Sequence, residues 1–283
     1  MRTGRSAFAG RRLGYDRYTV QGIRSRSPAR CRAWCRARLG QDQLLFAETM
    51  KNFNFEMKTS HGAMGGYISS GSPEKQQGVV LLPEIFGINN AMRLAADQFA
   101  REGFVVLAPD IFSQIEPGVE LTYSESDREI AISLWQRMDD QVALHDARVA
   151  VEALASDPRC DGSVSVLGFC LGGKYALQLS AIGGIDSSVS FYPVKVQDYQ
   201  ADLAALKCPT QVHIGDSDAH IPAEVQEILM RALSIPPGLH EFFTYEKAGH
   251  GFFNSVRSFG FAPEAAKLAL SRSVEFLRRH HSA

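Results

Sequence analysis

The chain has 283 residues, 45% of them hydrophobic, and a formal net charge of −1 at pH 7. This length and apolar content are sufficient for a large buried core, and the near-zero charge gives no reason to expect a nucleic acid or a membrane surface as a partner. The sequence contains no apolar run of about 18 residues that could span a bilayer.

The first 49 residues differ in composition from the rest of the chain. They contain eleven arginines, no lysine and three acidic residues, Asp16, Asp42 and Glu48. An organelle presequence or a basic interaction tail would be Arg-rich. Arginine without lysine is also typical of a GC-rich upstream frame read as protein, with translation starting at Met50, and we favour this third interpretation. We therefore expect residues 1–49 to be a disordered or untranslated leader and residues 50–283 to form one domain.

After Met50, short apolar runs alternate with helical patterns. Strands are predicted over residues 53–58, 64–69, 79–82, 104–108, 164–168, 189–192, 210–214 and 241–245. Helices are predicted over residues 90–102, 127–155, 172–181, 222–233 and 263–279. This alternation predicts a single α/β domain with a mostly parallel central sheet and helices on both faces. In such open sheets, chemistry collects at the carboxyl ends of the strands.

The segment after strand 164–168 contains a Gly-x-Cys-x-Gly-Gly pattern, formed by Gly168, Cys170, Gly172 and Gly173. This pattern is typical of a nucleophile elbow with sulfur in place of the usual hydroxyl. The glycines relieve crowding where the chain reverses sharply from strand to helix, and a helix N-terminus favours the reactive thiolate. The alternative is a buried structural cysteine before a glycine-rich helix.

Two later strands end in residues that could serve this thiol. Asp216 and Asp218 follow strand 210–214, and His250 follows strand 241–245. The order nucleophile, acid, histidine is that of an α/β-hydrolase triad. Either aspartate could orient His250, and the other would then cap a turn or the next helix; we choose Asp218. The other internal histidines lack such a context and are predicted to be surface or structural residues: His61, His145, His213, His220 and His240.

A second carboxylate, Glu84, follows strand 79–82. By topology, the loop that contains it would supply one N–H group of an oxyanion hole, so we predict a hole made by the backbone N–H groups of Ile85 and Leu171. An acid at this place would lie beside the thiol. The alternative is a surface glutamate before a turn.

Together these segments resemble the dienelactone hydrolase family over essentially all of residues 53–280. The matching pieces are Pro83-Glu84-Ile85-Phe86-Gly87, Pro109-Asp110, Leu134-Trp135-Gln136, Gly168-Phe169-Cys170-Leu171-Gly172-Gly173, Gly215-x-x-Asp218 and Ala248-Gly249-His250. The resemblance implies an α/β-hydrolase fold and a Cys170, Asp218 and His250 triad. It also implies that the resting thiol is protonated and bonded toward Glu84, which substrate displaces, so that the sulfur is protected from oxidation.

The family's substrates are small lactones that carry a carboxylate, so the resemblance implies a cation that binds it. Arg128 stands seven residues before Trp135, as the family's first substrate arginine does. The second family arginine lies four residues after the histidine, where this chain has the uncharged Asn254, with Arg257 three residues further on. The aromatic residues Phe86, Trp135 and Tyr192 are predicted to form pocket walls, or else to belong to the core.

The sequence therefore predicts a hydrolase that cleaves a small ester or lactone through a thioester on Cys170. His250 would transfer protons and Asp218 would orient it, with no metal and no cofactor. The five cysteines are too unevenly spaced for a disulfide framework, so we expect a cytoplasmic protein. We also expect a monomer whose only partner is a small carboxylate-bearing substrate. Two alternatives remain: a general carboxylesterase or thioesterase of the same fold, and a non-catalytic binding protein that has kept the fold.

Overall fold

The central strands are hydrophobic along their whole length because both of their faces are covered. The computed structural model describes residues 52–282, so the predictions for residues 1–49 lie outside the described residues. In the third strand, Val79 and Leu81 belong to one buried cluster, and the alternate residues Val80 and Leu82 belong to a second cluster. This period of two places one cluster on each face of the sheet.

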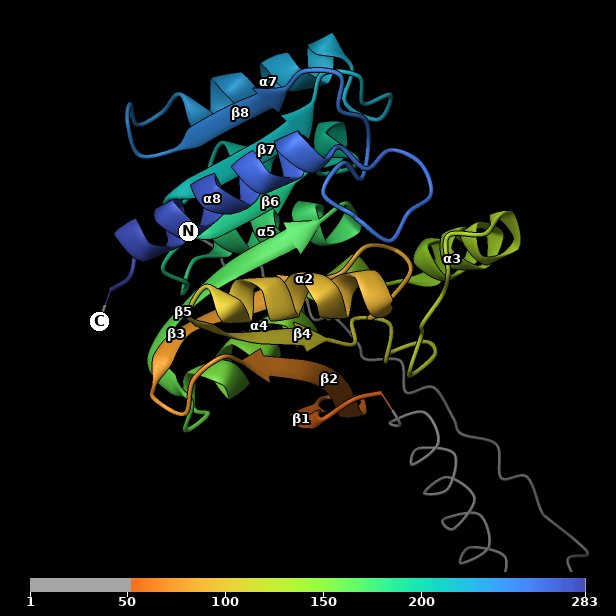
Figure 1. Cartoon of the computed structure of the whole chain (residues 1–283), viewed down its shortest axis with the longest axis vertical. Helices are drawn as coiled ribbons and strands as arrows, with labels where there is room; N and C mark the ends of the chain where they lie inside the picture. The colour runs from red at the N-terminus through yellow and green to blue at the C-terminus, as the bar shows by residue number, and fades with distance from the viewer. Residues whose placement is uncertain (1–51, 283) are drawn as a thin grey trace, which may run out of the picture. The chain divides into compact units, whose positions relative to one another are not determined.

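The described residues form one eight-stranded sheet with the strand order β1-β2-β4-β3-β5-β6-β7-β8 (Figure 1). The strands are β1 Phe55–Thr59, β2 Gly62–Ser70, β3 Gln76–Leu82, β4 Phe104–Pro109, β5 Cys160–Phe169, β6 Ser188–Phe191, β7 Thr210–Gly215 and β8 Glu241–Tyr245. The pairs β1–β2 and β2–β4 are antiparallel, and the other neighbours are parallel. The predicted fold class, an α/β-hydrolase fold with a mostly parallel sheet, is confirmed.

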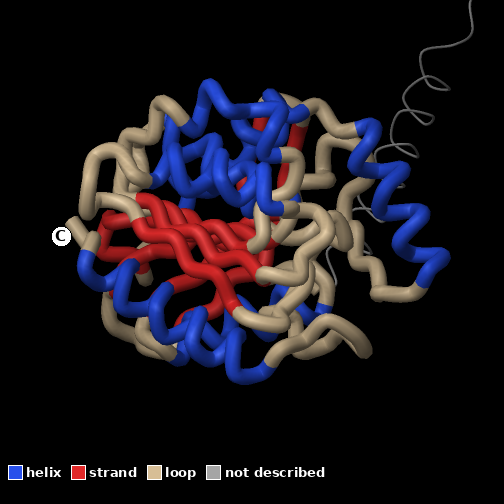
Figure 2. Tube along the Cα trace, turned by 90° about the horizontal axis from the view of Figure 1, so that it is seen from above, coloured by secondary structure: helices blue, strands red, loops and turns tan. Residues whose placement is uncertain are grey.

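Helices pack on both faces of this sheet (Figure 2). They are α2 Asn90–Arg101, α3 Glu125–Arg137, α4 Asp140–Ala155, α5 Leu171–Ile182, α6 Gln200–Leu203, α7 Ala223–Leu233 and α8 Pro263–Arg279, with a 3-10 turn at Val196–Tyr199. Helices α2 and α8 lie in front of the sheet in Figure 1, and α4 and α5 lie behind it. Among the described residues, no helix has the length and apolar character that crossing a membrane requires.

The structure corrects two predicted elements. The single helix predicted over residues 127–155 is wrong, because Met138 is extended (φ −67°, ψ 139°) and ends α3. Asp139 then starts α4 by accepting the N–H groups of Gln141 and Val142. The strand predicted over residues 164–168 begins earlier, at Cys160, where its pairing with β3 is irregular.

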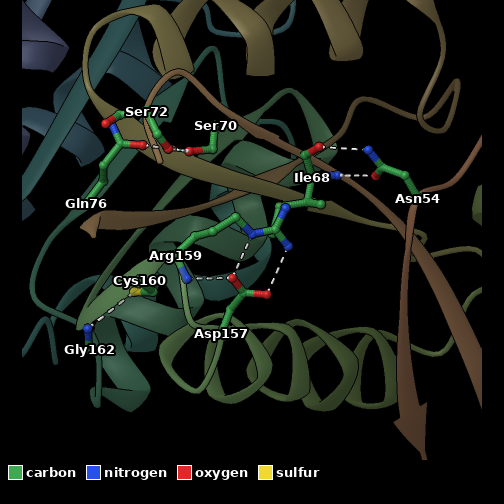
Figure 3. A network of polar contacts seen from close by, with 9 residues as sticks. All are labelled: Asn54, Ile68, Ser70, Ser72, Gln76, Asp157, Arg159, Cys160 and Gly162. Carbon is green, nitrogen blue, oxygen red and sulfur yellow. Dashed lines mark hydrogen bonds and ion pairs between the residues drawn. The ribbon is translucent and has the colours of Figure 1, made fainter. Parts of the chain in front are cut away.

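Polar contacts fix the strand ends that lie far from the carboxyl edge of the sheet (Figure 3). Arg159 donates to Asp157 at 2.8 and 2.9 Å just before β5, and the Cys160 sulfur accepts the Gly162 N–H at 3.4 Å. The Ser70 hydroxyl donates to Gln76 Oε1 at 2.7 Å between β2 and β3. Cys160 is therefore a structural cysteine, whereas Cys170 lies at the opposite end of the same strand.

Candidate active site

Cys170 occupies a sharp turn between β5 and α5. Its φ of 55° and ψ of −109° are strained values for a residue with a side chain. A Cβ atom on Gly168 would lie 2.0 Å from the Gly172 oxygen, and one on Gly172 would lie 2.1 Å from the Leu82 oxygen. Both glycines are therefore required by close backbone contact, and the turn holds the Cys170 side chain at the carboxyl edge of the sheet.

His250 contacts a buried carboxylate and lines the same cavity as Cys170. Its Nδ1 is 2.8 Å from Oδ2 of Asp218, a residue that is only 3% exposed. The other Asp218 oxygen accepts the backbone N–H of His220 at 2.8 Å. The alternative acid, Asp216, is exposed and accepts the hydroxyl of Ser217 instead. Of the two aspartates left open by the sequence, Asp218 is the one that meets His250.

The electrostatics of His250 depend on both neighbours. Burial lowers the pKa of the imidazole, but the charge of Cys170 and hydrogen bonds with Asp218 and Cys170 outweigh burial and raise the pKa to about 10. The arrangement can transfer a proton between Cys170 and His250, with Asp218 stabilising the protonated ring.

Glu84 is buried beside this site, with 2% of its surface exposed. Its carboxylate accepts the Tyr123 hydroxyl at 3.1 Å, the Tyr192 hydroxyl at 3.3 Å and Nδ2 of Asn254 at 3.2 Å. Within the described part of the chain, no hydrogen bond joins Glu84 to the Cys170 thiol. The structure thus differs from the resting arrangement that the family resemblance implies, because three neutral donors hold both carboxylate oxygens.

The predicted oxyanion-hole residues lie on two segments that are tied together. Leu171 is the first residue of α5, and the first N–H groups of a helix have no carbonyl partner within it. Ile85 lies in the turn after β3 and faces the cavity beside Cys170. The N–H of Gly172 donates to the Pro83 oxygen at 3.0 Å, which fixes the β3 turn against the start of α5.

A cavity of about 1020 Å³ opens over Cys170 and His250. The predicted substrate residues Phe86, Arg128 and Trp135 line it. Tyr192 and Asn254, also predicted to contact substrate, are not among its lining residues. They are 0% and 4% exposed and lie behind Glu84, because their hydroxyl and amide groups bind its carboxylate.

Comparison with known proteins identifies the family. The Dienelactone hydrolase family model matches residues 64–281. The chain belongs to this family. The carboxymethylenebutenolidase of Pseudomonas putida is 32% identical over 210 residues, which are 73% of this chain and 88% of the relative. That of Pseudomonas sp. strain P51 is 32% identical over 221 residues, 77% of this chain and 91% of the relative.

Solved structures share the fold of this family member. A putative dienelactone hydrolase from Klebsiella pneumoniae superposes with a TM-score of 0.70 at 21% identity, covering 80% of this chain and 98% of the other. The family model and the two carboxymethylenebutenolidases show that the protein is a hydrolase of the dienelactone hydrolase family that acts on lactones or esters. Among residues 52–282, no group of three or more His, Cys, Asp or Glu side chains is placed to hold a metal ion.

Three cavity-side residues of this dienelactone hydrolase family member were not assigned a role from the sequence. Tyr123 lies in a loop without a motif, so no local pattern could indicate its contact with Glu84. His220 is exposed, as predicted, but its ring faces the cavity and lies 4.6 Å from that of His250. Arg257 also lines the cavity, with Nη1 donating to the His250 oxygen at 3.1 Å. Arg257 therefore places a guanidinium group at the wall of the cavity.

Proposed function

We propose that this hydrolase cleaves small carboxylate-bearing lactones or esters through a thioester on Cys170, with His250 and Asp218 completing a triad. The observation that supports the proposal best is the 2.8 Å contact between the Asp218 carboxylate and His250, which lines the same cavity as Cys170. All three side chains follow the carboxyl ends of parallel strands, where α/β proteins bind their ligands. The cavity above Cys170 leaves space for a substrate carbonyl.

In the proposed reaction, His250 takes the proton of the Cys170 thiol as the sulfur attacks the substrate carbonyl carbon, and the N–H groups of Ile85 and Leu171 bind the resulting oxyanion. The carbon–oxygen bond to the leaving group then breaks, and His250 donates a proton to the leaving oxygen. A water molecule loses a proton to His250 and attacks the thioester. The carbon–sulfur bond breaks, the acid product leaves, and the thiol–imidazole pair is restored.

Two arginines could bind the substrate carboxylate. Arg128 and Arg257 both line the cavity, and each lowers the pKa of His220 through its charge, after the larger effects of burial and of His250. The two guanidinium groups therefore act on one part of the cavity. Bidentate pairing between guanidinium and carboxylate groups would orient an anionic substrate there.

The size of the cavity favours a second candidate, a carboxylesterase for larger esters. At about 1020 Å³ the cavity is at the upper end of the range for sites that hold drug-sized ligands. Phe86 and Trp135 give it apolar walls that could hold a larger acyl or alcohol group. Both candidates use the same triad and differ only in substrate.

The test is hydrolysis of cis- and trans-dienelactone and of p-nitrophenyl acetate by the protein and by Cys170→Ala. We expect the substitution to remove nearly all turnover, because the covalent route requires the sulfur. Lactone turnover that depends on Cys170 would support the first candidate, whereas Cys170-dependent turnover of the simple ester alone would keep the triad and exclude dienelactone as the substrate. Turnover that persists in Cys170→Ala would contradict the proposed nucleophile.

A further inference from the structure

The cavity over Cys170 receives different kinds of side chain from the two sides of β5. Strands β3 and β4 lie on one side of β5 in the sheet, and β6 and β7 lie on the other. The segments after β3 and β4 contribute mainly apolar and aromatic side chains, and the charged groups of Glu84 and Arg128. Alongside three small apolar residues, the segments after β6 and β7 contribute Lys195, Gln197, Asp198, Ser217 and His220. We call these five residues the polar side of the cavity. The proposed reaction uses none of them.

His220 adjoins the triad. Its ring lies 4.6 Å from that of His250, edge to face at an angle of 62°. One oxygen of the Asp218 carboxylate accepts the backbone N–H of His220 at 2.8 Å, and the other is 2.8 Å from Nδ1 of His250. A single carboxylate therefore fixes the backbone of one histidine and the ring of the other, and it holds the two rings next to each other at the cavity wall.

The His220 ring has the chemistry of a hydrogen-bonding site. Burial and the nearby charge of His250 lower its pKa below the ordinary 6.5, so the ring is mainly neutral at pH 7. A neutral imidazole offers one N–H donor and one nitrogen acceptor. Within residues 52–282, the backbone N–H is the part of His220 that makes a hydrogen bond, and both ring nitrogens remain free to bind a ligand.

The leaving group of the substrate has to lie close to this ring. In the proposed reaction, His250 donates a proton to the leaving oxygen, which must then be within about 2.6–3.2 Å of the imidazole nitrogen. Because the His220 ring lies against that of His250, the atoms bonded to the leaving oxygen come within reach of His220. Gln197 and Asp198 follow β6, the strand beside β7, and can bind groups further along the same alcohol.

We infer that the polar side of the cavity binds the alcohol part of the substrate, and that His220 selects esters whose alcohol carries hydroxyl groups close to the ester oxygen. The inference rests on the proposed function, in which His250 protonates the leaving oxygen. His220 is a specificity-determining residue in this account and takes no part in proton transfer. A hydroxyl can pair with its ring nitrogens, whereas an alkyl group would displace water from them without replacing its hydrogen bonds.

The experiment compares glycerol 1-acetate with propyl acetate, which share the acyl group and the three-carbon chain and differ by two hydroxyl groups. The full-length wild type should have the higher kcat/KM for the glycerol ester. In His220→Phe, which keeps an aromatic ring against His250, we expect the ratio of the two kcat/KM values to fall about fivefold, as loss of one hydrogen bond produces. Both esters form the same acetyl thioester, so a change in the triad itself cancels from this ratio.

Two further variants test the chemistry of the ring. His220→Gln retains a donor and an acceptor, and it should keep most of the preference for the glycerol ester. His145→Phe is the matched control, because it makes the same substitution at an exposed histidine of α4 that does not line the cavity. It should leave the ratio unchanged.

The inference would be overturned if His220→Phe left the ratio at its wild-type value or lowered both kcat/KM values equally, since an equal loss would mean that His220 only supports His250. It would also fail if the wild type turned over p-nitrophenyl acetate but showed no preference for the glycerol ester. Turnover that survives in Cys170→Ala would instead contradict the proposed function. Cys170-dependent turnover with a ratio insensitive to His220 would contradict this inference alone.

Discussion

Two buried carboxylates flank Cys170, and they differ in what they bind. Asp218 meets the titratable ring of His250 at 2.8 Å, whereas Glu84 meets two tyrosine hydroxyls and an amide at 3.1 to 3.3 Å. The first carboxylate can stabilise a positive charge that appears and disappears on its partner. The second has partners that do not titrate near neutral pH. Acids of similar burial are therefore suited to different tasks by their hydrogen-bond donors rather than by their own chemistry.

Replacing Asp218 by Asn should have the largest effect. The amide keeps the shape of the side chain but removes the charge that stabilises protonated His250 and fixes its tautomer. We expect kcat to fall by about 10³- to 10⁴-fold, as loss of the acid does in related triads. Steady-state kinetics would measure this, with circular dichroism to verify the fold. A loss below about tenfold would mean that Asp218 is not the orienting acid.

Replacing Glu84 by Gln should have a smaller effect. The Gln oxygen can still accept hydrogen bonds, but its NH₂ group must face at least one of the donors that the second carboxylate oxygen now binds. The unmet hydrogen bond costs about 1–3 kcal/mol and disturbs the turn that carries Ile85, so we expect about a tenfold fall in kcat. If kinetics showed equal losses for the two acid-to-amide changes, the contrast between the carboxylates would be broken.

Replacing Arg257 by Gln should change substrate selection more than rate. A partly exposed ion pair is worth up to about 1 kcal/mol, so KM for a carboxylated ester should rise severalfold while KM for p-nitrophenyl acetate stays constant. The neutral ester serves as the internal control, because Arg257 also donates to the His250 oxygen. An equal rise for both esters would assign Arg257 a structural role alone.

Asp110 is a third buried carboxylate and sharpens the comparison, because its donors are the backbone N–H groups of Phe112 and Gly118. Burial raises its pKa from 3.8 to about 7. Between about pH 4 and 7, Asp110 therefore keeps its proton in the folded protein but loses it in the unfolded chain. The stability that this carboxyl group provides at low pH is lost as the pH rises through that range. We expect substitution of Asp110 to change catalysis less than the substitutions of Asp218, Glu84 and Arg257 do.

Urea unfolding of the wild type and of Asp110→Asn at several pH values would measure this linkage. Relative to the variant, the wild-type free energy of unfolding should fall by a few kcal/mol across that window, at about 1.4 kcal/mol for each pKa unit. A constant difference between the two proteins would show that Asp110 does not titrate in that range.

The sequence predicted the parts of the site that local sterics and chain order determine. Gly168 is required by a backbone contact within the elbow and Gly172 by a backbone contact with the end of β3, so their spacing around Cys170 indicated the turn. Asp218 and His250 could be placed because each follows a parallel strand, and the strands end at a common edge. The break at Met138 was missed because its apolar side chain continues the helical pattern.

The contacts of Glu84 could not be predicted in this way. Tyr123 and Asn254 are separated from Glu84 by 39 and 170 positions, and no spacing rule connects them. Asn254 was predicted to face substrate because an arginine stands at that place in the family. An uncharged amide can turn inward to a buried carboxylate at little cost, and Arg257, on the same loop, faces the cavity instead.

The most direct test of the central claim is to quench the enzyme with acid during turnover of p-nitrophenyl acetate and to locate the acyl group by peptide mass spectrometry. The account predicts one acetyl group on the peptide that contains Cys170, increased in Asp218→Asn if this variant slows hydrolysis of the thioester more than its formation. Acetylation of another residue that is chemically competent for turnover, with none on Cys170, would contradict the account.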